Sequence, residues 1–207
     1  MKIAVIATGE MKEEMLAQGL TDDISIKWQE KITAAEEVDC YIDLLYTPTP
    51  ERTEKLKELL PAIIIINAVT TTLDSVPESF IRINGWPGFL KRAIVEAACN
   101  NTRTKILAEK VFNYFNKKME WTPDIAGFIS ARIISMIINE AWFALDEKVS
   151  SKEEIDTAMK LGTNYPYGPF EWGEKIGLEK IYSLLTELAK KNSRYEPAAL
   201  LKKQVTL

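Results

Sequence analysis

Short apolar runs separated by polar segments mark the first half of the chain. Runs of strand length lie at Lys2–Ala7, Ile24–Trp28, Tyr41–Tyr46 and Ile63–Asn67. Helices are predicted around them over residues 10–18, 51–60 and 100–117. Alternation of strand and helix is typical of a parallel sheet. Residues 1–121 are therefore predicted to form a small, Rossmann-like α/β domain.

The chain changes character at Trp121–Pro123, because proline cannot continue a helix. Beyond this point, apolar residues from Ile125 to Leu145 recur at helical spacings around most of a helix, and Asp124 is placed to cap it. So much apolar surface needs either a large core or a second subunit. We therefore expect residues 122–207 to be an all-α domain that forms a homodimer.

Three further helices are predicted in this second domain. A capping box of Ser151 and Glu154 opens the first of them, and Gly162 is its expected left-handed stop. A proline-rich turn then leads to helices over residues 170–175 and 178–191.

Composition narrows the possible functions. The 207 residues are 46% hydrophobic and 27% charged, which is typical of a globular protein. The net charge of −4 offers no basic footprint for nucleic acid, and no apolar run is long enough to span a membrane. No histidine is present, so metal sites and serine–histidine catalysis are not expected. Two cysteines without a signal peptide favour a reduced, cytoplasmic protein.

Several motifs of the second domain resemble a known family. They are Asp124-Ile-Ala-Gly-Phe-Ile, Asn139-Glu-Ala, Glu154-Ile-Asp-Thr-Ala-Met-Lys-Leu-Gly162, Tyr165-Pro-Tyr-Gly-Pro-Phe-Glu171 and Gly177-Leu. Together they resemble the C-terminal domain of the 3-hydroxyacyl-CoA dehydrogenases. The resemblance implies a shortened NAD-binding domain followed by a helical dimerisation domain, and NAD-dependent oxidation of a 3-hydroxyacyl-CoA.

The resemblance also implies catalytic positions. In the family, a histidine takes the proton of the substrate hydroxyl, a glutamate orients it, and an asparagine and a serine help to hold the substrate oxygen. Counting back from Glu96 places Asn84 at the histidine position, while Thr71 and Ala131 occupy the serine and asparagine positions. An asparagine cannot accept a proton at neutral pH. We therefore predict absent or very slow dehydrogenase activity, unless Glu96 itself acts as the base.

A dinucleotide-binding motif is expected after the first strand. Gly9 keeps the middle of three glycines, whereas Ala7 and Lys12 occupy the first and third positions. Glu10 adds a negative charge beside the expected phosphates, and Glu30 is the acidic residue nearest to the position that binds ribose. The long side chain at position 12 should push the helix away from the strand. NADH is therefore expected to bind weakly or not at all.

A βα unit of the family pattern is missing before Tyr41, so the sheet should be small and the cofactor crevice short. Two classes of function stay open. The first is a divergent 3-hydroxyacyl-CoA dehydrogenase that uses NAD. The second is a non-catalytic, dimeric relative that binds an acyl-CoA-type molecule or serves as a scaffold.

Overall fold

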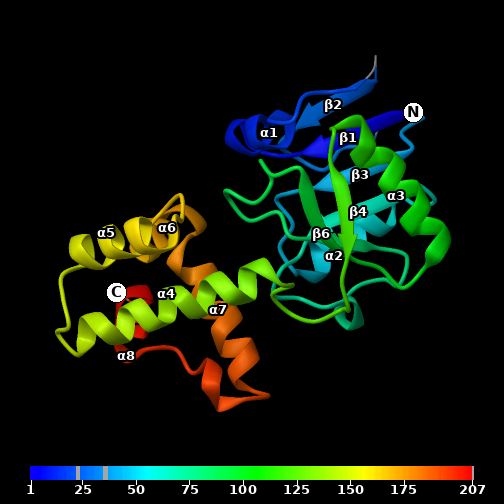
Figure 1. Ribbon diagram of the computed structural model, residues 1–207. Helices are drawn as coiled ribbons and strands as arrows, with labels where there is room; N and C mark the ends of the chain where they lie inside the picture. Colours follow the sequence, from blue (N-terminus) through cyan, green and yellow to red (C-terminus); the bar gives the residue numbers. More distant parts are fainter. Residues whose placement is uncertain (22–23, 35–36, 207) are drawn as a thin grey trace. The chain divides into compact units, whose positions relative to one another are not determined.

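The computed structural model describes residues 1–21, 24–34 and 37–206, which fall into two compact units, Met1–Phe128 and Ile129–Leu207 (Figure 1). The first unit alternates strands and helices, and the second is helical. This order confirms the predicted fold class, an α/β part followed by an all-α part. No helix in the described part of the chain has the length and apolar character needed to cross a membrane.

The described residues of the first unit form a seven-stranded sheet with the order β2-β1-β3-β4-β5-β6-β7. Its strands are β1 (Lys2–Ile6), β2 (Ser25–Gln29), β3 (Cys40–Asp43), β4 (Ile63–Asn67), β5 (Ile81–Ile83), β6 (Ile94–Ala98) and β7 (Lys118–Trp121). β5 and β6 pair antiparallel, and the other neighbours are parallel. The expectation of a small sheet is wrong, because β5, β6 and β7 extend it beyond the four predicted strands.

Helices α1 (Gly9–Leu16) and α3 (Thr102–Tyr114) cover one face of the sheet, and α2 (Pro50–Lys57) covers the other. Successive side chains of a strand point to opposite faces. Ile3 and Val5 of β1 accordingly lie in a core cluster with residues of α1 and α3. Ala4 and Ile6 lie in a second cluster with Leu56 of α2. The strand β1 is therefore buried on both faces.

The connection from β2 to β3 is the short part of the first unit. Gln29 ends β2, Cys40 begins β3, and the described residues between them contain no helix. This is the region in which the sequence analysis expected a βα unit of the family pattern to be absent. Among the described residues, α2 is consequently the only helix in the second core cluster.

The segment after β7 is bonded to the sheet through Arg82 of β5. Arg82 is fully buried, and its Nε lies 2.8 Å from Asp124 Oδ1, as an ion pair without the alignment of a hydrogen bond. Its guanidinium also donates to the carbonyl oxygens of Thr71 and Ile125. The guanidinium carbon lies 4.2 Å from the centre of the Phe128 ring. Burial lowers the pKa of Arg82 to about 10, and the Asp124 carboxylate opposes this shift.

Asp124 is therefore not a helix cap, and that prediction was wrong. Its Oδ2 accepts a 2.8 Å hydrogen bond from the amide of Leu73, and the next helix begins only at Ser130. Gly127 and Phe128 have left-handed backbone, with φ of 86° and 49°. These two residues separate Asp124 from the helix that it was expected to cap.

The described part of the second unit contains α4 (Ser130–Asp146), α5 (Lys152–Thr163), α6 (Pro169–Ile176), α7 (Leu178–Ala189), the 3-10 turn η2 (Ser193–Tyr195) and α8 (Ala199–Val205). The predicted capping box is confirmed, since Ser151 Oγ accepts from the Glu154 amide at 3.3 Å. Gly162 lies inside α5, however, and the left-handed stop is Asn164, with φ of 54°. Asparagine tolerates this conformation better than most residues.

Asp156 fixes the turn between α5 and α6. Its buried carboxylate accepts hydrogen bonds from the amides of Phe170, at 2.8 Å, and Glu171, at 3.2 Å. It thereby caps α6 from the neighbouring helix. Gly168 packs against this carboxylate so closely that a Cβ there would lie 2.3 Å from Asp156. The Tyr165–Glu171 motif therefore specifies the packing of this helical unit.

Candidate active site

Asn84 and Glu96 meet inside the first unit. Asn84 directly follows β5, Glu96 lies in β6, and the antiparallel pairing of these strands brings the two residues together. Asn84 Nδ2 donates a 2.8 Å hydrogen bond to Glu96 Oε2, and the Asn84 amide donates to the Glu96 carbonyl at 2.9 Å. Their exposed fractions are only 3% and 9%. The structure thus brings together the two positions that the family resemblance pairs.

Both polar ends of the Asn84 side chain are bonded. Nδ2 donates to Glu96, while Oδ1 accepts from the amide of Trp86 at 3.4 Å. A carboxamide neither gains nor loses a proton near neutral pH. Asn84 can therefore orient Glu96, but it cannot serve as a general acid or base.

Asn67 holds the backbone around this pair. From the end of β4, its Nδ2 donates to the carbonyl oxygens of Leu44 and Gly85, each at 3.1 Å. Its Oδ1 accepts from the Gly85 amide at 2.9 Å. A Cβ on Gly85 would lie 2.8 Å from Asn67 Cγ, so a residue with a side chain cannot take this place without movement. One amide side chain thus joins the ends of three strands.

The loop between β5 and β6 is held by two charged side chains. Glu14 of α1 accepts from the Gly88 amide with both carboxylate oxygens, at 2.7 and 2.8 Å. Lys117 is buried, and its ammonium donates to two backbone carbonyls of the same loop. Burial lowers the pKa of Lys117 to about 8, and Glu14 opposes this shift. The residues that follow Asn84 are therefore tied to α1 and to the start of β7.

Two further catalytic positions were predicted, Thr71 and Ala131. The backbone carbonyl of Thr71, after β4, accepts from Arg82. Ala131 belongs to the second unit, where it is fully buried on α4. No group of three or more Cys, Asp or Glu side chains in the described ranges is arranged to hold a metal ion.

The predicted cofactor residues lie at the carboxyl ends of β1 and β2. Ala7 follows β1, and its amide donates to the Gln29 carbonyl at 2.9 Å. Gly9 begins α1, and a Cβ built on it would meet no atom within 4 Å. Thr8 caps the helix, because its Oγ1 accepts from the Met11 amide at 3.3 Å.

Lys12 does not force α1 away from β1, contrary to the expectation. Its side chain lies on the exposed side of the helix, with Nζ 5.4 Å from the centre of the Trp28 ring. Met15 of the same helix is fully buried in the core. The expectation was wrong because the flexible lysine side chain extends over Trp28 instead of into the packing of helix and strand.

Glu30 follows β2 and lines a cavity of about 340 Å³ together with Lys31, Arg52 and Lys55. Arg52 Nε and Nη2 bind the fully buried Asp43 carboxylate at 2.8 and 2.7 Å. Burial raises the pKa of Asp43, and Arg52 opposes this shift. A bidentate ion pair therefore fixes one wall of this cavity.

Comparisons with known sequences agree on one family. The sequence profile of the 3-hydroxyacyl-CoA dehydrogenase C-terminal domain matches residues 127–207. A 3-hydroxyadipyl-CoA dehydrogenase of Escherichia coli is 45% identical over 86 residues, which are 41% of this chain and 18% of the relative. A 3-hydroxybutyryl-CoA dehydrogenase of Bradyrhizobium diazoefficiens is 29% identical over 220 residues, covering 95% of this chain and 75% of the relative. The chain thus spans only part of the length of these relatives.

Solved structures share the whole fold. The (S)-3-hydroxybutyryl-CoA dehydrogenase of Ralstonia eutropha superposes with a TM-score of 0.77 at 20% identity, covering 99% of this chain and 93% of the other. Residues 127–207 match the C-terminal domain of the 3-hydroxyacyl-CoA dehydrogenases, and the chain as a whole is similar to members of that family. The resemblance seen in the sequence motifs is confirmed.

The 3-hydroxyacyl-CoA dehydrogenase family is NAD-dependent, and a pyrophosphate would bind at the turn between β1 and α1. Gly9 leaves open space there. However, Thr8 already occupies the Met11 amide, and Glu10 places a carboxylate in the first turn of the helix. These residues do not fit the pyrophosphate of NAD.

Sequence reasoning missed Asn67 and the Asp43–Arg52 ion pair. Asn67 ends a run of four isoleucines, and Asp43 ends the apolar strand β3. A polar residue at the carboxyl end of a buried parallel strand was the available signal, because ligand crevices of such sheets lie there.

Proposed function

We propose that this 3-hydroxyacyl-CoA dehydrogenase relative binds an acyl thioester of coenzyme A but does not oxidise or reduce it with NAD at an enzyme's rate. The ligand class comes from the names of its relatives, which act on 3-hydroxyacyl thioesters. The main observation in favour of lost dehydrogenase activity is the Asn84 side chain. Its amide is bonded at 2.8 Å to Glu96, at the position where the family has a histidine. The poor fit of NAD at Thr8 and Glu10 supports the same proposal.

An active dehydrogenase is the second candidate. Alignment with the Bradyrhizobium enzyme over 95% of this chain supports it, since both structural units are retained. In that case Glu96 must replace histidine as the base.

Calorimetric titration separates the two candidates. Acetoacetyl-CoA should bind to the purified protein, and NADH should show no binding at low micromolar concentrations, alone or with acetoacetyl-CoA present. A 3-hydroxybutyryl-CoA dehydrogenase assayed in parallel serves as the positive control. Low-micromolar NADH affinity would contradict the proposed loss of chemistry, and absent binding of acetoacetyl-CoA would contradict the proposed ligand class.

We also propose that the protein is a homodimer and that α4 contributes to its interface. Ile129 and Ile133, one turn apart at the start of α4, are each 53% exposed. Exposed apolar side chains on one helix face are typical of a subunit interface.

Ile133→Glu should therefore convert the dimer to a monomer, because the interface offers the new charge no partner. Light scattering at micromolar concentration measures this change, and an unchanged circular dichroism spectrum excludes unfolding. Glu140→Gln, at an exposed polar position of the same helix, should leave the dimer intact. A monomeric wild-type protein would refute the homodimer.

The proposed compartment is the cytoplasm. Cys40 and Cys99 are both buried as free thiols, which is usual for proteins of reducing compartments. Burial raises the pKa of both thiols, so they are protonated and unreactive at neutral pH.

A further inference from the structure

The loop that connects β5 to β6 is packed on the core of the first unit and bonded to α1. Three of its side chains are buried: Trp86, Phe89 and Leu90. Glu14 of α1 accepts from the Gly88 amide with both carboxylate oxygens, at 2.7 and 2.8 Å. Gln18 Nε2, just beyond α1, donates to the Lys91 carbonyl at 2.9 Å. These contacts define a closed position of the loop.

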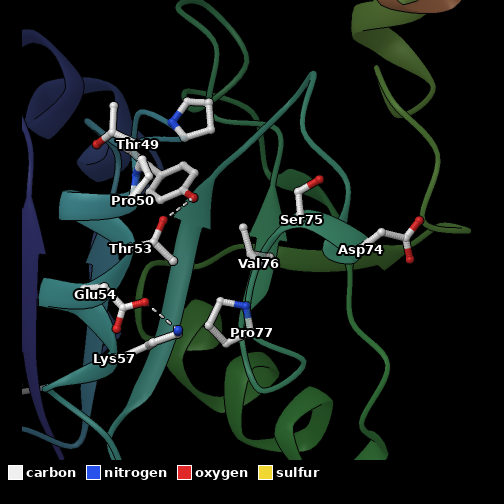
Figure 2. Close-up of a pocket in the computed structure, with 11 residues that line it drawn as sticks. Thr49, Pro50, Thr53, Glu54, Lys57, Asp74, Ser75, Val76 and Pro77 are labelled. Carbon is white, nitrogen blue, oxygen red and sulfur yellow. Dashed lines mark hydrogen bonds and ion pairs between the residues drawn. The ribbon is translucent and has the colours of Figure 1, made fainter.

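Lys117 holds the same loop with a buried ammonium group. Its side chain is 1% exposed, and Nζ donates to the carbonyl oxygens of Leu90 and Arg92. No carboxylate in the described part of the chain lies within ion-pair distance of this ammonium. Lys57, in a cavity of about 520 Å³ between α2 and the segment with the 3-10 turn η1 (Leu73–Ser75), is different. There, as Figure 2 shows, the ammonium is paired with Glu54, at 2.6 Å.

A buried ammonium bonded only to neutral acceptors is less stable than the same group in water. Removing the ion from water costs more free energy than two charge-assisted hydrogen bonds return. A neutral amine avoids this cost and still has two N–H groups, one for each carbonyl. Burial accordingly lowers the pKa of Lys117 from its usual 10.5 to about 8.

The charges around Lys117 do not cancel the effect of burial. Glu14 on α1 favours the protonated amine and so opposes that effect. The last turn of α3, residues 111–114, carries no charged side chain, and its titratable group is the phenol of Tyr114. The other charged groups on the elements around Lys117 are exposed, and water screens them: Lys91, Arg92 and Lys118.

We propose that the loop between β5 and β6 is a pH-sensitive latch, closed most firmly when Lys117 is neutral and loosened when Lys117 takes up a proton. An open loop exposes the amine to water, so the open state binds the proton more tightly than the closed state does. Acid therefore favours opening, and closure strengthens as the pH rises from about 8 towards 10.5. The loop follows Asn84 directly, so its opening changes the backbone next to the Asn84–Glu96 pair. No ligand takes part, so the latch does not depend on the function proposed above.

Hydrogen exchange of the loop amides, followed by NMR on the full-length, ¹⁵N-labelled protein, measures the opening. Each rate is divided by the intrinsic exchange rate of an unstructured peptide at the same pH, which gives the opening constant. For the amides of Gly88, Phe89 and Arg92, this constant should fall about tenfold from pH 7 to pH 9. A constant that is unchanged or rises over this range would overturn the proposal.

A matched pair of variants assigns the change to Lys117. Lys117→Met keeps a long side chain but has no proton to lose, so its opening constant should not change with pH. Lys118→Met makes the same substitution at the exposed neighbour and should keep the tenfold fall. A Lys117→Met protein with the pH dependence of the wild type would overturn the proposal.

A titration of the wild-type protein tests the latch without any variant, and it decides the question if Lys117→Met does not fold. The ¹³Cε resonance of Lys117 should titrate with a midpoint near pH 8. A midpoint at the usual 10.5 would show that the closed loop does not disfavour the ammonium, and the latch would be refuted.

Discussion

Asn84→His should raise the rate of acetoacetyl-CoA reduction by about a hundred to ten thousand fold over the wild-type protein, the usual contribution of a positioned general acid or base. The partner of such a histidine is already in place, because Asn84 Nδ2 donates to Glu96 Oε2 at 2.8 Å. A carboxylate at this distance orients an imidazole and stabilises its protonated form. The assay follows NADH absorbance at several pH values and at millimolar NADH, which offsets weak cofactor binding.

Two control variants show whether the gain in rate comes from proton transfer by the new histidine or from another effect of the substitution. Asn84→Gln keeps a carboxamide and should show no gain, because an amide cannot transfer the proton. Adding Glu96→Gln to Asn84→His should remove most of the gain, because the imidazole loses its orienting carboxylate. Rapid turnover by the wild-type protein would refute the proposed loss of chemistry and point to Glu96 as the base. An inactive Asn84→His protein would show that the loss of NAD binding, and not the missing base, prevents the reaction.

Hydrophobic patterning predicted the strands that are buried on both faces. β1 and β4 are continuous apolar runs, and such runs rarely form anything but central parallel strands when turn residues bound them. The flanking helices were predicted in the polar segments between these runs, and in the structure Thr8 and Thr49 cap α1 and α2 with their own side chains. These signals are local, so no knowledge of tertiary contacts was needed.

The strands β5 and β7 gave no comparable signal in the sequence. β5 has three residues, one of which is the charged Arg82, and β7 follows α3 almost directly. The helix predicted over 100–117 ends at Tyr114, because Asn116 adopts a left-handed backbone with φ of 53° and Lys117 turns into the core. These strands form because pairing with neighbours buries them, which a single sequence does not reveal.

The candidate site was predicted in part. The family resemblance paired Asn84 with Glu96, and in the structure the antiparallel strands β5 and β6 bring these two residues together. The hydrogen bonds that hold the backbone around this pair were not predicted. Asn67 bonds to residues 23 positions before it and 18 positions after it in the chain. Such contacts depend on the order of strands in the sheet, which the hydrophobic pattern left open.

Asp124→Ala should lower the free energy of unfolding by about 3 kcal/mol, the lower end of the range for breaking a buried ion pair. Arg82 is fully buried, so the substitution leaves its charge without the carboxylate at 2.8 Å. The lower end applies because Arg82 keeps its bonds to the Thr71 and Ile125 carbonyls. The Leu73 amide also loses its bond to Asp124. Urea unfolding followed by circular dichroism measures the change.

The double variant Arg82→Met with Asp124→Leu tests whether Asp124→Ala destabilises the protein because it leaves the buried charge of Arg82 without its carboxylate. It removes both members of the pair and should be less destabilised than Asp124→Ala alone, because no buried charge is left. Lys118→Ala, at an exposed position of β7, is the control for an ordinary surface change and should cost less than about 0.5 kcal/mol. If the double variant were as unstable as the sum of its single substitutions, Arg82 and Asp124 would act independently. The segment 122–128 would then be held to the sheet by its backbone bonds, such as that from the Gly127 amide to the Val69 carbonyl at 2.8 Å, and not by the ion pair.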